Sequence, residues 1–289
     1  MAWTPKARAL GRALRQARQE RGLSLREFAG RIGRDAGVLS RWETGERAPK
    51  PERVAQILAV LGLNGERYDE IMTLAYGIGE PQWVATTLPE QRQQMEAFLD
   101  NEQRATQIVE VAPQIIPGLL QTSDYVRTIM TDGGAPKEEI ATRVATRLGR
   151  RDVITRSHKP AKFLAVIGQG AFFWDVGGRA VTIEQLKYLS KMADLPNVEI
   201  RVVPHGVGWS PMMEGMFTLI EPEESTPVVF LETRRSSLCL YLDEDVNAYR
   251  EAVGATLKVA LGPQDSRTFI SEICKRMEKR DEYVAKVKS

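Results

Sequence analysis

Cysteine and histidine are scarce in this sequence, which has only two of each among its 289 residues. Cys239 and Cys274 have no ligand spacing, and neither His158 nor His205 stands near one of them in a metal-binding pattern. Two cysteines also provide no disulfide framework, as expected of a protein from a reducing, cytosolic compartment. We therefore expect neither a bound metal nor a fold stapled by disulfides.

Long apolar runs are missing as well. No stretch approaches the roughly 20 residues of a membrane-spanning helix. The start "MAWTPKARALGRAL" lacks the long apolar core and small-residue cleavage site of a signal peptide. We expect a cytoplasmic protein with no membrane partner.

Recognisable catalytic motifs are absent too. The sequence has no phosphate-loop Gly-Lys-Ser/Thr and no Gly-x-Ser-x-Gly nucleophile motif. "VIGQGAFF" follows a predicted strand, as a dinucleotide-binding loop would, but Phe173 stands where a third glycine must allow close helix–strand packing. His205 in "VVPHGVG" could act as a base, although a histidine at a strand end is more often a surface residue. We expect no enzyme, no catalytic residue and no cofactor.

The charges are unevenly distributed along the chain. The net charge is only +2, but residues 1–53 contain 13 Lys and Arg against six Asp and Glu, a net charge of +7. The remainder is mildly acidic. This asymmetry indicates that only the N-terminal part meets a polyanion such as nucleic acid.

The first 75 residues carry helical patterns throughout. Leu10, Leu14 and Ala17 fall on one face of a first helix, and "SLRE" has the capping-box spacing that starts a second helix near Leu25. After a turn, Asp35 can cap a short third helix, "AGVLSRWET", which ends before a glycine. A proline-headed fourth helix and a fifth follow. The second and third helices form a predicted helix-turn-helix.

The rest of the chain mixes strand and helix patterns. Residues 76–89, "YGIGEPQWVATTLP", are expected to be a linker, and a polar helix follows. Five later segments rich in Val, Ile, Phe and Tyr are predicted strands, in addition to "TQIVEV". The predicted fold class is mixed: an all-α helix-turn-helix bundle over 1–75, then a larger α+β domain over 90–289.

The stretch "GLSLREFAGRIGRDAGVLSRWETGERAPKPERVAQILAVLGL" resembles the XRE, or lambda-repressor-like, helix-turn-helix family. The resemblance implies that the third helix enters the major groove of double-stranded DNA. The base-facing positions would be Ala36, Gly37, Ser40 and Arg41. The flanking DNA-binding positions would be Ser24, Arg26, Arg31, Arg34, Arg47 and Lys50, whose basic members suit phosphates. The resemblance also implies a structural ion pair between Arg18 and Glu43.

From about Trp83 to Ile270 the chain resembles the C-terminal domain of actinobacterial antitoxin-like (WhiJ-like) regulators. The resemblance rests on "IIPGLLQTSDYVR", "RVATRLGRR", "PNVEIRVVP" and "VVFLET". It implies binding of a short, separately encoded partner protein. The loop "VIGQGAFFWDVGG" departs from the pattern, because Gly and Gln stand where an acidic residue would lead a helix.

Two groups of residues could contact such a partner. Arg143, Arg147, Arg150 and Arg151 recur at helical spacing as a basic stripe, which is either a solvated face or a surface for acidic side chains or flanking DNA. "WSPMMEGM" gathers Trp209, Met212, Met213 and Met216, which form either core or an adaptable binding surface. "PGLLQTSDY" is first of all a rigid turn and a capped helix.

Three hypotheses of function remain. The first is a sequence-specific, homodimeric transcriptional regulator, antitoxin-like and nucleoid-associated, whose second domain binds a small partner protein or dimerises. The alternative is a ligand-sensing repressor with a small-molecule pocket near the Met-rich loop. The third is an enzyme with a DNA-targeting head.

Overall fold

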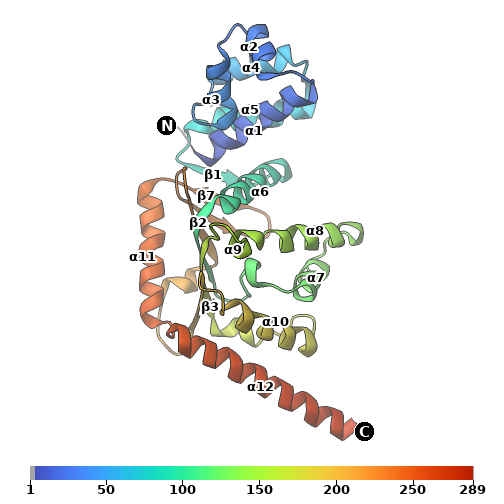
Figure 1. The fold of residues 1–289 in the computed structure, drawn as a ribbon, viewed down its shortest axis with the longest axis vertical. Helices are drawn as coiled ribbons and strands as arrows, with labels where there is room; N and C mark the ends of the chain where they lie inside the picture. The colour runs from blue at the N-terminus through green and yellow to red at the C-terminus, as the bar shows by residue number, and fades with distance from the viewer. Residues whose placement is uncertain (1–3, 289) are drawn as a thin grey trace. The chain divides into compact units, whose positions relative to one another are not determined.

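The computed structural model describes residues 4–288, with side chains described to residue 279. The chain divides into two compact units, each built from two segments: Met1–Asn101 with Glu221–Val246, and Glu102–Ile220 with Asn247–Ser289. Helices alone form the first part of the chain, and helices with strands form the rest (Figure 1). The predicted fold class is confirmed.

Helices that bury one apolar stripe each form a bundle at the start of the first unit. They are α1 (Pro5–Glu20), α2 (Leu25–Arg31), α3 (Ala36–Thr44), α4 (Pro51–Val60) and α5 (Gly65–Tyr76). Leu10, Phe28, Leu39, Ile57 and Ile71, one from each helix, are at most 1% exposed. Helices this short are marginal alone, so the shared core is what stabilises them.

Capping residues set the ends of α2 and α3. Ser24 Oγ accepts the Glu27 N–H at 3.3 Å, while the Glu27 carboxylate accepts the Ser24 N–H at 2.9 Å. Hydrogen bonding to Ser24 holds the pKa of Glu27 below its usual value. Asp35 Oδ1 accepts the Gly37 N–H at 2.7 Å, and Gly45 ends α3 in the left-handed conformation with φ of 78°. The chain therefore forms the helix-turn-helix that the sequence predicts.

Helices α1 and α3 approach each other closely at Gly11. A Cβ atom built there would lie 2.5 Å from the carbonyl oxygen of Trp42 and 2.7 Å from that of Glu43. Backbone atoms cannot swing aside as a flexible side chain can, so only glycine permits this approach. The position of α1 thereby fixes the position of α3.

The first unit continues beyond the bundle into three strands and a helix. The chain forms a 3-10 turn, η1 (Gly77–Gly79), then β1 (Gln82–Ala85) and α6 (Leu88–Gln103), and returns later as β6 (Val228–Glu232) and β7 (Ser237–Leu240). The strand order is β1-β7-β6, and both pairings are antiparallel.

Residues 76–89 are an integral part of this unit and not the linker that we expected. Trp83 on β1 is 1% exposed, and its carbonyl oxygen accepts a hydrogen bond from the Gln94 side chain at 2.6 Å. Glycine and proline in this stretch favoured a linker. The alternation of exposed and buried residues in "QWVA" is instead a strand pattern, too short to stand out before its partner strand is known.

Ion pairs fasten α1 to this part of the unit. Arg8 and Arg12 contact Asp100 on α6 at 2.6 and 2.9 Å, and Lys6 contacts Glu80 at 2.9 Å. The side chains of Lys6 and Arg8 are only 7% and 6% exposed. Lys6 and Arg8 are therefore paired with acidic residues inside the unit, although both belong to the 13 basic residues among positions 1–53.

Four further strands of the seven-stranded sheet follow one another in the order β5-β2-β3-β4. They are β2 (Ala105–Ala112), β3 (Lys162–Gly168), β4 (Val198–Val203) and β5 (Phe217–Pro222). Strands β2, β3 and β4 are parallel, with Ala112 opposite Ile167 and Gly168 opposite Val203. The carboxyl ends of these three strands therefore meet at one edge.

Helices α7 to α10 lie on one side of these strands and α11 on the other (Figure 1). The segment expected as one helix, "KEEIATRVATRLGRRDVI", is divided in two, because the chain turns where the Arg151 N–H donates to the Leu148 carbonyl three residues back. The elements are α7 (Ser123–Asp132), α8 (Lys137–Gly149), α9 (Asp152–Thr155), α10 (Arg179–Met192), α11 (Asp243–Val259) and α12 (Pro263–Lys288), with 3-10 turns η2 (Gly118–Leu120), η3 (Gln169–Phe172) and η4 (Pro211–Glu214).

Candidate functional site

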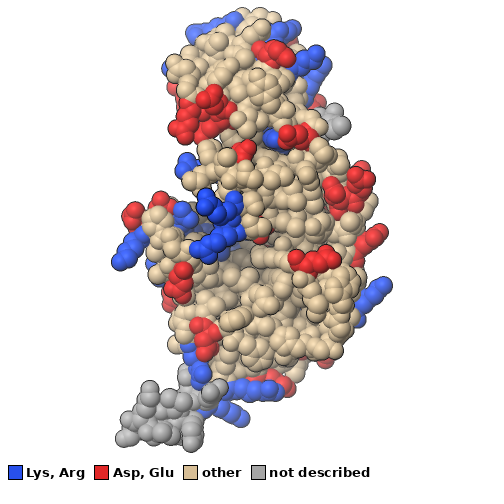
Figure 2. Space-filling model, turned by 180° about the vertical axis from the view of Figure 1, so that it is seen from behind, with Lys and Arg blue, Asp and Glu red and all other residues tan. Residues whose placement is uncertain are grey.

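The residues expected to contact DNA lie on α2, α3 and the loops beside them. Ser24, Arg26, Arg31, Arg34, Gly37, Arg41, Arg47 and Lys50 are exposed, and Ala36 and Ser40 are half-buried. The four α3 positions share the outer face of that helix, since they stand at i, i+1, i+4 and i+5. On the face drawn in Figure 2, the helices α1–α5 carry basic side chains along their outer edge, with a few acidic ones among them.

Ser24 and Gly37 have a structural explanation besides any contact with DNA. Ser24 forms the capping box of α2. A Cβ atom at Gly37 would lie 2.9 Å from Asp35 Oδ1, so glycine leaves room for the cap of α3. Arg41 differs, because its exposed guanidinium can donate two parallel hydrogen bonds to guanine.

Arg18 and Glu43 form a bidentate ion pair between α1 and α3. Arg18 Nε contacts Glu43 Oε1 at 2.6 Å, and Arg18 Nη2 contacts Glu43 Oε2 at 2.8 Å. The side chains are 8% and 4% exposed, and hydrogen bonding to Glu43 raises the pKa of Arg18. Arg18 Nη1 also donates to the Leu23 carbonyl at 2.6 Å. One buried guanidinium thus connects α1, the loop before α2, and α3.

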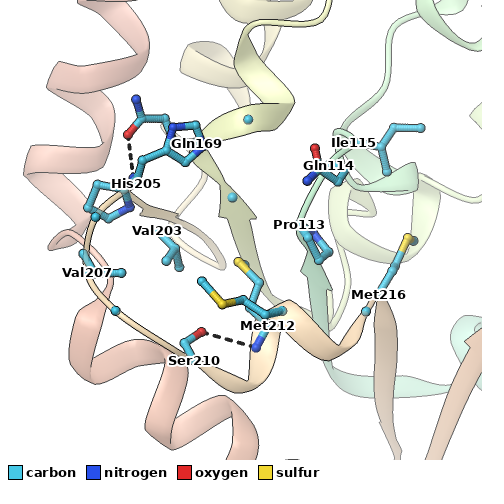
Figure 3. A pocket seen from close by; sticks show the side chains of 17 residues that line it. Pro113, Gln114, Ile115, Gln169, Val203, His205, Val207, Ser210, Met212 and Met216 are labelled. Carbon is cyan, nitrogen blue, oxygen red and sulfur yellow. Dashed lines mark hydrogen bonds between the residues drawn. The ribbon is translucent and has the colours of Figure 1, made fainter.

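A cavity of about 580 Å³ lies in the second unit, where β2, β3 and β4 end (Figure 3). Its walls are formed where these strands end, at residues 113–115, 168–170 and 203–208, together with Ser210, Met212, Met213, Gly215 and Met216. The carboxyl edge of parallel strands is where open α/β sheets place their ligands, because the loops there diverge. This position makes the cavity the second candidate site.

The lining of the cavity is mainly apolar and carries no fixed charge. Val203, Met212 and Met216 give it an apolar surface, while Gln114, Gln169, His205 and Ser210 are its polar side chains. Among the described residues that line it, no Lys, Arg, Asp or Glu is found. A few polar groups that converge within an otherwise apolar lining are typical of small-molecule sites.

Hydrogen bonds hold the polar side chains of the cavity in place. Gln169 Oε1 accepts the backbone N–H of His205 at 2.8 Å, which connects the loops after β3 and β4 (Figure 3). Gln114 Oε1 accepts the Trp174 Nε1–H at 3.3 Å, and Ser210 Oγ accepts the Met212 N–H at 3.3 Å. The carbonyl oxygens of both glutamines are therefore already engaged.

A second hollow of about 600 Å³ adjoins the first and shares Gln114, Gln169 and His205 with it. Phe173 and Trp174 complete this hollow, although their side chains are 56% and 59% exposed. Trp209 and Met213, on the segment 209–216, are 68% and 65% exposed. Large apolar side chains thus face solvent around the cavity.

Two family models match the sequence. Residues 9–71 match a helix-turn-helix domain, and residues 95–272 match a domain of unknown function, DUF5753, over more than half of the chain. The chain belongs to the DUF5753 family. No curated protein matches the sequence. The helix-turn-helix match agrees with the observed α2–α3 geometry and indicates an XRE-like DNA-binding regulator.

The cavity falls within the DUF5753 region, since every residue that lines it lies between positions 113 and 216. Among the described residues, no helix combines the length and apolarity needed to cross a bilayer. Nor do those residues include a group of three or more His, Cys, Asp or Glu side chains placed to hold a metal ion.

The arginine stripe of the DUF5753 domain, expected as either a solvated face or a surface for acidic side chains or flanking DNA, makes contacts within the domain. Arg150 makes a bidentate ion pair with Glu102 at 2.8 Å, and its side chain is 15% exposed. Arg147 donates to Gln121 Oε1 at 3.3 Å, and Arg143 pairs with Glu139 on its own helix at 2.7 Å. Arg150 in particular turns inward, because Glu102 is almost fully buried and needs a cation.

Arg147 and Arg150, but not the exposed Arg143, belong to a group of charges beside the "PGLLQT" segment. Glu110 on β2 is 3% exposed and accepts the Gly118 N–H at 3.0 Å. Burial raises the pKa of Glu110 to about 7, against the opposing effects of that hydrogen bond and of the Arg150 charge. The segment is thus tied down by a buried carboxyl group and not only by its proline and glycine.

Helix α7, which "PGLLQTSDY" was expected to begin with a cap, has no side-chain cap at its N-terminus. Thr122 occupies the N-cap position, but its side chain makes no capping hydrogen bond. Gln185 on α10 holds the loop instead, with Oε1 accepting the Thr122 N–H at 2.7 Å and Nε2 donating to the Leu120 carbonyl at 2.6 Å. A long-range contact has replaced the local one.

Of the expected partner- or ligand-contacting residues, Met212 and Met213 line the cavity, while Trp209 does not. Met216, from the same Met-rich segment, lines it too, whereas sequence reasoning missed Gln114 and Gln169. A usable indication was present, because the two glutamines come shortly after predicted strands, and the carboxyl ends of parallel strands meet at one edge.

Proposed function

We propose that the chain is a sequence-specific transcriptional regulator that reads double-stranded DNA with the outer face of α3. The observation that carries this proposal is the exposed Arg41 on a capped recognition helix, flanked by exposed arginines on α2 and in both adjoining loops. Arg41 can read guanine, and the flanking cations can bind phosphates on either side of the groove. Ala36 and Gly37 offer only contact with a thymine methyl group or close backbone approach.

Replacing Arg41 with alanine is expected to weaken binding at the cognate site by about 1–3 kcal/mol and to change binding to random DNA much less. Fluorescence anisotropy with labelled duplexes measures both affinities. Arg15→Ala is the matched control, because Arg15 is exposed on α1 and its removal changes the net charge equally. Equal losses on cognate and random DNA would show that Arg41 does not read bases.

Salt should weaken DNA binding steeply. If each bundle neutralises about 4–6 phosphates, the plot of log affinity against log salt concentration has a slope of about −4 to −5. A slope near zero would contradict the proposed phosphate contacts.

The regulator is proposed to act as a homodimer on two half-sites. One short helix with few readable side chains gives too little discrimination for a genome, whereas two-fold pairing doubles the contacts. The half-sites would lie about one DNA turn, or a multiple of it, apart. Analytical ultracentrifugation should show two chains per operator duplex, and one chain per duplex at saturation would contradict the dimer.

The same proposal makes the DUF5753 domain a binding domain and not an enzyme. Its cavity is lined by neutral side chains, apart from the single titratable residue His205, and the engaged glutamines are binding groups and not nucleophiles.

A small protein partner, in an antitoxin-like arrangement, is a second candidate function of this domain. The exposed Trp209 and Met213 favour it, because they could serve as apolar anchors. Titration with the small protein encoded by a neighbouring gene should give a complex that Trp209→Ala weakens by about 2 kcal/mol or more. Unchanged affinity in that variant would remove this surface from the interaction.

A further inference from the structure

The cavity at the carboxyl ends of β2, β3 and β4 is not used by the proposed DNA contacts, and its lining selects a ligand class. We propose that it binds an uncharged, largely apolar small molecule that carries a carbonyl or similar hydrogen-bond acceptor. The inference does not depend on DNA binding or on a protein partner.

The charge of the ligand follows from the lining. An ionised ligand would lose its hydration on entry, and the described lining residues include no Lys, Arg, Asp or Glu to compensate for that loss. Nucleotides bind at the same edge of related sheets through the N-terminus of a long helix. Here the loop after β3 forms only the four-residue turn η3, and α10 begins later, at Arg179. A phosphate or carboxylate group is therefore disfavoured.

The hydrogen-bonding character of the ligand follows from what the protein has already used. Gln114 Oε1 is engaged by Trp174 and Gln169 Oε1 by His205, so each glutamine keeps its amide N–H groups as donors. Ser210 Oγ accepts a hydrogen bond from Met212 and retains its O–H. The Gln114 amide nitrogen points toward the space above Pro113 and Val203 (Figure 3). Donors that have no partner among the described residues call for acceptors on the ligand.

The size and shape of the ligand follow from the remaining wall. A volume of about 580 Å³ lies within the range of roughly 300–1,000 Å³ that holds drug-sized molecules. Met212 is 4% exposed and lies deep, while Met216 is 38% exposed and lies near the opening. Methionine side chains adapt to the outline of an apolar ligand, which suits a flat ring system or a branched chain.

The first experiment measures binding of N-phenyl-1-naphthylamine, an uncharged apolar dye that fluoresces when it leaves water, to the full chain. Met216→Glu should weaken dye binding by about tenfold or more, because it places a carboxylate in the lining. Met95→Glu is the matched control, since Met95 on α6 is also 38% exposed but lies outside the cavity. Equal binding by the two variants, or no binding by the unmodified chain, would overturn the proposal.

The second experiment compares three competitors of nearly equal size: 2-acetylnaphthalene, 2-ethylnaphthalene and 2-naphthoate. We expect the ketone to displace the dye best, by roughly 2- to 12-fold over the hydrocarbon, which corresponds to one neutral hydrogen bond. Gln114→Leu should remove this preference while leaving dye binding within about twofold. If naphthoate competes best, the ligand is an anion and the proposal fails; if ketone and hydrocarbon are equal, the acceptor requirement fails.

Discussion

Replacing Arg18 with alanine is expected to lower the free energy of unfolding of the α1–α5 bundle by about 3–5 kcal/mol. Removal of the guanidinium takes the ion-pair partner away from the Glu43 carboxylate, whose side chain is only 4% exposed. It also removes the donor to the Leu23 carbonyl. A loss of this size approaches the whole stability of a small domain. DNA binding should be lost because α3 is no longer held, not because Arg18 reads bases.

The measurement is urea denaturation of the full chain, monitored by hydrogen exchange of the backbone amides in α1–α5. Arg21→Ala serves as control, since Arg21 is exposed and donates one hydrogen bond to the Gly62 carbonyl; it should cost less than about 1 kcal/mol. The double change Arg18→Met with Glu43→Leu should recover much of the loss, because it removes both charges together. A single-variant loss below about 1 kcal/mol would show that the pair is not stabilising.

Replacing Glu110 with glutamine is expected to stabilise the DUF5753 domain above pH 7 and to flatten its dependence on pH. Burial raises the pKa of Glu110 to about 7 in the folded chain, so the folded state favours the protonated form. The contribution of protonated Glu110 to folding stability is fully present below the ordinary pKa of about 4.5. It is lost as the pH rises through about 7. The difference between the ordinary and the folded-state pKa of Glu110 corresponds to roughly 3 kcal/mol of folding free energy. Glutamine can still accept the Gly118 N–H but never ionises.

The test is denaturation of both proteins at several pH values between 5 and 8.5. The stability advantage of Glu110→Gln should be small at pH 5 and reach roughly 2–3 kcal/mol at pH 8. Glu139→Gln, at an exposed carboxylate paired with Arg143, should show no such trend. If the free energy of unfolding changes with pH in the same way for Glu110→Gln and the unmodified chain, Glu110 is ionised in the folded state throughout this range.

Local chemistry made the helix-turn-helix predictable. The Ser24–Glu27 box, the Asp35 cap and Gly45 act over a few residues, so their pattern in the sequence already contains the cause of the structure. The Arg18–Glu43 contact spans 25 positions, and it was expected only because a family resemblance supplied the pairing.

The second domain was harder to predict because its decisive contacts are long-range. Arg150 lies on a regular basic stripe in sequence, but its partner Glu102 is 48 positions away, and burial of that carboxylate turned the side chain inward. The cavity requires three strand ends to be brought to one edge. No periodicity within a single segment records that arrangement, although the strand pattern together with the parallel-sheet rule could have suggested it.

The route of the chain through the first unit has a consequence for its biogenesis. Strand β1 pairs with β7, and the ring of Phe98 packs edge-on against that of Phe230, with 4.9 Å between the ring centroids. Residues 82–98 therefore depend on a segment that is synthesised more than 120 residues later. A ribosome releases the N-terminus first, and domains usually fold in that order. Here the first unit cannot be completed until residue 246 has emerged, by which time most of the second has been translated. Nascent chains stalled before that point would present an unpaired β1 edge to chaperones. An expression fragment that ends near residue 101 would likewise expose the unpaired edge of β1.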